Sequence, residues 1–211
     1  MIASHIHDAL SQVRRLQELI LNKRQFMGYS GKARIASGVL ALAGAGALSR
    51  GIVPATPEAH LIAWGIILAG AVVLNYSCLA YWFFFDDHVR RNPIMLKPAL
   101  DAIPALAVGA ALTVALVLAR QFDLLFGVWM CLYGLAQAAY RQSLPGGIYL
   151  VGLCYILCGA AYLVFSGVSF LNPWPMGLMF FLGELAGGWT LIHQEYTQQQ
   201  LLQKEQADHA E

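Results

Sequence analysis

Long apolar runs alternate with short polar segments along most of this chain. An apolar helix of about 20 residues crosses the hydrocarbon core of a bilayer, so each long run predicts one membrane-spanning helix. The first and fourth runs are short and need flanking residues to complete a span. The six predicted spans cover approximately Ala33 to Ser49, His60 to Phe85, Pro98 to Ala119, Leu124 to Tyr140, Gly147 to Ser166 and Pro175 to His193.

The two ends of the chain have different patterns. Between His5 and Met27, apolar residues recur in steps of three and four among charged residues, which predicts an amphipathic helix too charged to span a bilayer. After the sixth run, the polar stretch QEYTQQQLLQKEQ contains no Gly or Pro, so the last helix is expected to continue into it. We therefore divide the chain into residues 1–30, a bundle at 31–194 and a polar helical tail at 195–211.

The distribution of basic residues predicts the orientation in the membrane. Lys and Arg are enriched in cytoplasmic loops. If the N-terminus is cytoplasmic, only Arg50 and Arg120 of the 13 Lys and Arg residues fall on the opposite side. We therefore expect six spans in a cell inner membrane, with the amphipathic N-terminal helix and the C-terminal tail both cytoplasmic.

Composition agrees with an all-α integral membrane protein. Hydrophobic residues make up 58% of the chain and charged residues 12%, whereas an ordinary soluble domain has about 25% charged residues. The net charge of +1 gives no indication of a nucleic-acid partner. The four cysteines fall in apolar runs, and we interpret them as small packing residues rather than a disulfide framework.

Chemistry-bearing motifs are few. The sequence lacks a His-Glu-x-x-His motif, a recognisable Ser and His pair and any clear spacing of metal ligands. His60 and His193 are expected on opposite faces of the membrane, which argues against axial haem ligation. We expect no enzyme activity, no cofactor and no metal site.

One carboxylate stands out near the centre of the sixth apolar run. Glu184 is flanked by Gly183 and Gly187 at GxxxG spacing and is followed by Gly188. An ionisable residue at this depth is costly in hydrocarbon and indicates either a proton or cation site or a hydrogen bond between helices. Tyr133 is predicted at a similar depth, with Asn75 and Gln137 slightly nearer the cytoplasm, and these three complete a candidate intramembrane polar site.

The first span is dense in small residues. Its sequence, ARIASGVLALAGAGALS, includes Gly44 and predicts close helix packing, either within the bundle or between subunits. This span, the charged N-terminal helix and the stretch LLFGVWMCLYGLAQ together resemble an uncharacterised bacterial six-span membrane protein family with an N-terminal amphipathic helix. The resemblance implies no catalytic residues.

Two functions are compatible with these observations. The first is a non-enzymatic membrane scaffold or accessory subunit that acts through helix packing and cytoplasmic terminal helices, with the lipid bilayer and a protein partner, or a second copy of the chain, as its contacts. The alternative is a small transporter or channel with a proton or cation site at Glu184. A transport pathway requires a water-accessible cavity at Glu184, whereas a scaffold can bury the residue against glycine-lined backbone.

Overall fold

The structure is a computed structural model that describes residues 29–85, 103–139, 144–165 and 167–208. Within these ranges it is helical and contains no strand, which confirms the predicted all-α class. The helices are α2 (Gly31–Ser49), α3 (Pro57–Phe85), α5 (Ile103–Leu118), the short 3-10 helix η2 (Phe122–Leu124), α6 (Leu125–Ala139), α7 (Gly146–Val164) and α8 (Trp174–Asp208). The amphipathic helix expected within residues 1–30 lies almost entirely outside the described residues.

Four described segments are long and apolar enough to cross a membrane, as expected of a multi-pass membrane protein. They are Pro57–Phe85, Phe122–Ala139, Gly146–Val164 and Trp174–Thr197. The apolar helix α5 is shorter, and α2 is not among the four. The count of six spans and the cytoplasmic position of both termini therefore stay predictions.

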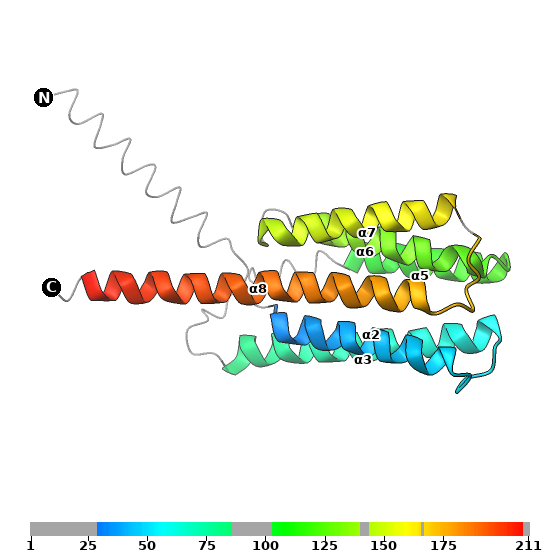
Figure 1. Cartoon of the computed structure of the whole chain (residues 1–211), viewed down its shortest axis with the longest axis horizontal. Helices are drawn as coiled ribbons and strands as arrows, with labels where there is room; N and C mark the ends of the chain where they lie inside the picture. Colours follow the sequence, from blue (N-terminus) through cyan, green and yellow to red (C-terminus); the bar gives the residue numbers. More distant parts are fainter. Residues whose placement is uncertain (1–28, 86–102, 140–143, 166, 209–211) are drawn as a thin grey trace, which may run out of the picture.

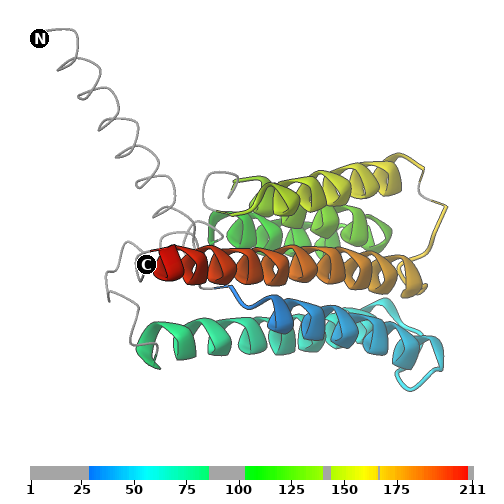
Figure 2. The same cartoon turned by 60° about the vertical axis from the view of Figure 1, so that its left-hand side comes forward.

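The helices form two close antiparallel pairs, and each pair carries one further helix. α2 pairs with α8, α6 pairs with α7, α3 packs on α2, and α5 packs on α6. In both views α8 lies between the α2 and α3 side and the α6 and α7 side (Figures 1 and 2). Because α8 also contacts α7, it joins the two halves of the bundle.

Glycines account for the close approach within both pairs. A Cβ atom added to Gly134 of α6 would lie 2.5 Å from the carbonyl oxygen of Gly152 in α7. In the other pair, a Cβ on Gly31 of α2 would lie 2.5 Å from the carbonyl oxygen of Gly188 in α8. The backbones therefore touch at positions where any larger residue would push the helices apart.

Two apolar clusters lie toward opposite ends of the bundle. The larger contains many aromatic residues; Phe126 and Phe170 pack there with ring centroids 4.7 Å apart. The smaller consists of Leu79, Leu144, Ile148 and Leu191, with Tyr29 and Trp82 packed against it. Large apolar side chains also cover the outer surface of the helices, for example Leu157 of α7, as a lipid-facing surface requires.

Candidate polar site at Glu184

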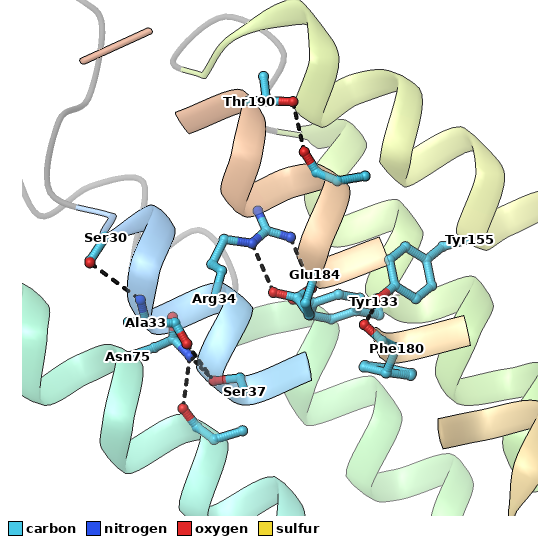
Figure 3. Close-up of polar contacts among 12 residues, drawn as sticks. Ser30, Ala33, Arg34, Ser37, Asn75, Tyr133, Tyr155, Phe180, Glu184 and Thr190 are labelled. Carbon is cyan, nitrogen blue, oxygen red and sulfur yellow. Dashed lines mark hydrogen bonds and ion pairs between the residues drawn. The ribbon is translucent and has the colours of Figure 1, made fainter. Parts of the chain in front are cut away.

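The carboxylate of Glu184 is bound by side chains from two other helices (Figure 3). Arg34 of α2 donates from Nε to Oε2 at 2.8 Å and from Nη2 to Oε1 at 2.9 Å. The hydroxyl of Tyr133 in α6 donates to Oε1 at 2.6 Å. Glu184 is 4% exposed and Arg34 is 7% exposed, so this triad of Arg34, Tyr133 and Glu184 is buried in the bundle.

Local sequence places Arg34 at the start of α2. The hydroxyl of Ser30 accepts a hydrogen bond from the backbone N–H of Ala33, and this N-cap fixes where the helix begins. Arg34 therefore lies in the first turn, and its guanidinium lies against Gly187 of α8. A Cβ at Gly187 would lie 2.9 Å from the Cζ atom of Arg34, so glycine leaves the room that the guanidinium occupies.

Electrostatics explain why a carboxylate is tolerated at this depth. A buried charge costs several kcal/mol unless it is paired and hydrogen-bonded. The planar guanidinium binds both carboxylate oxygens in a two-pronged arrangement, and the hydroxyl of Tyr133 gives a third charge-assisted hydrogen bond. The triad is therefore neutral in total and joins α2, α6 and α8.

The other predicted polar residues are divided between different partners. Asn75 of α3 donates to the hydroxyl of Ser37 at 2.7 Å and to the carbonyl oxygen of Ala71 at 2.9 Å, and no described hydrogen bond links it to Glu184. Ser37 in turn donates to the carbonyl oxygen of Ala33 at 3.0 Å. Of the three residues expected beside Glu184, Tyr133 bonds to it directly, whereas Asn75 connects α3 to α2.

Gln137 of α6 is buried without a partner. It is 4% exposed, and neither polar atom of its side chain has a hydrogen bond within the described part of the chain. It lies one helical turn from Tyr133 on the same face of α6. Gln137 is therefore near Tyr133 along α6, but its amide is not hydrogen-bonded to the triad.

The four glycines selected from the sequence have different neighbours. Gly183 faces the ring of Tyr155 in α7, and Gly187 faces the side chain of Arg34. Gly188 contacts the backbone of Gly31, and Gly44 contacts Ile67 of α3. Gly188 thus allows backbone contact between helices, whereas the other three leave space for a side chain.

Arg34 is the residue of the site that the sequence interpretation did not select. In the sequence, Arg34 contributes to the excess of basic residues that predicts the orientation. Its position inside a span of small residues, GKARIASG, was the available signal, because a basic residue there needs an acidic partner.

The four cysteines differ in burial. All four are free thiols; Cys78 and Cys131 are partly buried, whereas Cys154 and Cys158 lie on the exposed surface of α7 and do not pack within the described bundle. Among the described residues, no three His, Cys, Asp or Glu side chains are close enough to hold a metal ion.

Comparison with known proteins supplies no relative for this chain. No protein-family model matches it, and neither a curated protein nor a solved structure is significantly similar to it. The resemblance to a bacterial six-span family stays a prediction, and the geometry of the polar site is the main basis for a function.

Proposed function

We propose that the protein is a non-enzymatic membrane scaffold or accessory subunit, a six-span bundle with both termini in the cytoplasm. The observation that carries this proposal is the triad. Arg34 and Tyr133 both bind the carboxylate of Glu184, and the three side chains come from three different helices. Such a set of contacts fixes the arrangement of α2, α6 and α8.

The same contacts argue against a transport role for Glu184. A carboxylate that carries a proton or a cation has to exchange its partners with water during each cycle. Here the carboxylate is 4% exposed and is bound by a guanidinium, which lowers its attraction for a second cation. A structural role accounts for both the burial and the pairing.

Two observations support counting α2 as a span. α2 packs against the apolar part of α8 from Gly31, which contacts Gly188, to Ala45, which contacts Gly177. Its Arg34 is neutralised by Glu184, which removes the largest cost of placing that residue in the bilayer. We propose that α5 is completed as a span by its flanking residues.

The proposed partner surface is the far end of α8. This helix has 35 residues and so is about 50 Å long, and its C-terminal end extends beyond the other described helices (Figure 1). Gln199, Gln200 and Gln203 are exposed on this projecting part. Their amide groups can donate and accept hydrogen bonds, and we propose that a protein partner binds them here.

The test combines a flux measurement with crosslinking. In proteoliposomes, we expect proton and cation flux through the wild-type protein and through Glu184→Gln to equal the flux of empty liposomes. A photocrosslinking residue placed at Gln199 or Gln203 in native membranes is expected to form discrete protein adducts. The same residue at the lipid-facing Leu157 is the control and should give no protein adduct.

The opposite result would support the alternative function. Flux above that of empty liposomes, lost in Glu184→Gln at equal protein content and folding, would make the protein a small transporter or channel with its proton or cation site at Glu184. The absence of adducts at Gln199 and Gln203 would contradict the proposed partner surface on α8.

A further inference from the structure

The orphaned amide of Gln137 requires an explanation. A buried polar group without a hydrogen bond costs about 1–3 kcal/mol, and native proteins contain few of them. Gln137 leaves both an oxygen acceptor and a nitrogen donor unpaired. An unpaired group of this kind commonly indicates an internal water molecule.

Contacts between helices place Gln137 level with the triad. The Cβ of Gln137 lies 3.1 Å from where a Cβ on Gly152 of α7 would be. On α7, Gly152 lies between Gly147, which contacts Thr190 of α8, and Tyr155, which contacts Gly183. The corresponding level of α8 lies between residues 183 and 190 and includes both Glu184 and Gly187, against which the guanidinium of Arg34 lies.

The direction of the side chain agrees with this placement. Side chains on an α-helix lean toward its N-terminus. Gln137 therefore leans toward the turn of α6 that carries Tyr133, whose hydroxyl binds Glu184. The unpaired amide and the triad thus belong to one polar layer of the bundle.

This polar layer is enclosed on both sides by apolar residues. Ile148 of the smaller cluster lies one turn from Gly152 on α7 and is fully buried. Tyr155 lies about one turn from Gly152 in the other direction, is also fully buried and belongs to the larger cluster. A molecule held between these clusters would be separated from bulk solvent at both ends.

The chemistry of the layer selects a small neutral molecule. Arg34 and Glu184 neutralise each other, so the layer has no net charge to attract an ion. The amide of Gln137 offers both a donor and an acceptor, and water can satisfy both. We propose that Gln137 holds at least one internal water molecule, which connects its amide to the triad of Arg34, Tyr133 and Glu184.

X-ray radiolytic labelling followed by mass spectrometry tests this proposal. Irradiation converts water to hydroxyl radicals where the water resides, so a buried side chain becomes oxidised only if water lies near it. Tyr155 and Phe126 form a matched pair, because both are 0% exposed. Tyr155 contacts Tyr133 of the triad with ring centroids 5.0 Å apart, whereas Phe126 lies in the aromatic part of the larger cluster.

We expect Tyr155 and Tyr133 to be oxidised several-fold faster than Phe126 in the reconstituted wild-type protein. In Gln137→Met, which keeps a similar side-chain size but has no amide, oxidation of both tyrosines should fall several-fold while that of Phe126 stays unchanged. Equal, slow oxidation of Tyr155 and Phe126 in the wild-type protein would overturn the proposal. If Gln137→Met does not fold, the comparison of Tyr155 with Phe126 in the wild-type protein still tests whether water lies near the triad.

Persistence of tyrosine oxidation in a folded Gln137→Met protein would also overturn the proposal, because the water would then not be held by Gln137. The thermal midpoint gives an independent readout. Loss of a water-bonded amide should lower it, whereas removal of a dry, unpaired amide should raise it. Met130→Leu, on the same face of α6, is the control for a change of apolar shape without a change in polarity.

Discussion

For the ion pair of Arg34 and Glu184, removing one residue is expected to cost more stability than removing both. Losing one member of a buried ion pair leaves the other charge unpaired, whereas replacing both with apolar residues removes the cost of burying either charge. Both residues lie in the interior, so the remaining charge stays buried after its partner is removed. We therefore expect the pair to contribute more to defining the helix arrangement than to net stability.

We predict that Arg34→Met lowers the free energy of unfolding by about 3 kcal/mol or more. The double variant Arg34→Met with Glu184→Met should be more stable than Arg34→Met alone. Equilibrium unfolding in mixed detergent micelles, measured for the wild-type protein, both single variants and the double variant, gives the coupling energy. Additive effects of the two substitutions would contradict a direct ion pair.

Tyr133 offers a second test at the residue scale, with a matched control. Its hydroxyl donates to a carboxylate, whereas the hydroxyl of Tyr162 donates to the neutral carbonyl oxygen of Val168 at 3.1 Å. Hydrogen bonds to charged groups contribute about 1.5–3 kcal/mol, and neutral ones about 0.5–1.5 kcal/mol. Tyr133→Phe should therefore destabilise the protein about twice as much as Tyr162→Phe, and equal losses would count against a charged Glu184.

The interactions of the site show how far sequence reasoning reaches at the residue scale. The cost of a carboxylate in hydrocarbon identified Glu184, because that cost depends on the residue itself and on its depth. The choice among possible partners depends on which faces of the helices meet, and a single sequence does not contain that information. Tyr133 was selected by depth and contacts Glu184, Asn75 was selected by the same argument and bonds to Ser37, and Arg34 was not selected.

At the scale of helices, a glycine at a helix contact differs from a glycine on an open surface in what an added methyl group would contact. Gly134 faces the carbonyl oxygen of Gly152, which is part of the backbone and cannot turn away. Gly65 of α3 has no atom within 4 Å of an added Cβ. The two glycines therefore provide a comparison between a packed helix contact and an open surface.

Gly134→Ala is expected to lower the thermal midpoint by several degrees, because the α6 and α7 backbones have to separate to accept the methyl group. Gly65→Ala should leave the midpoint unchanged or raise it slightly, since alanine favours a helix over glycine by about 0.5–1 kcal/mol. Thermal unfolding of both variants in the same detergent is the measurement. A similar effect of the two substitutions would contradict the close contact between α6 and α7.

Helices were easier to predict than their pairing. Periodicity, length and apolar content identified the segments that form α3, α6, α7 and α8, because these properties belong to one helix at a time. Pairing is determined by the match of glycine positions between helices distant in sequence, as for Gly31 of α2 and Gly188 of α8. The small-residue composition of α2 predicted close packing but did not identify α8 as its neighbour.

At the scale of the whole molecule, α8 combines two roles that are usually separate. Its first part supplies Glu184 and contacts both halves of the bundle, and its last part extends beyond the other described helices (Figure 1). Because α8 is continuous, a partner bound to its projecting part would contact the same helix that carries Glu184. In the proposed scaffold, binding at the C-terminal end is thus mechanically connected to the packing of the bundle.

The orientation of α8 in the membrane is the last prediction, and cysteine labelling in whole bacteria tests it. The loop before α3 and the C-terminal part of α8 lie at opposite ends of the bundle, since Ala45 of α2 contacts Gly177 while Gly31 contacts Gly188. In a variant without the four native cysteines, a membrane-impermeant maleimide should label Ala55→Cys in intact cells with a permeable outer membrane. Gln203→Cys should be labelled only after the inner membrane is opened.

Labelling at these two positions distinguishes a reversed orientation from a wrong placement of the two sites on opposite sides of the membrane. The reverse labelling pattern would leave the bundle intact and place the projecting end of α8 outside the cell, where cytoplasmic partners cannot reach it. Labelling of both positions in cells with an intact inner membrane would contradict the placement of the two sites on opposite sides of the membrane. The expected pattern requires that Arg50 and Arg120 face outward, where Arg120 forms an exposed ion pair with Glu58 at 2.7 Å. Arg50 and Arg120 are only two of the 13 Lys and Arg residues, so this orientation still places the excess of basic residues on the cytoplasmic side.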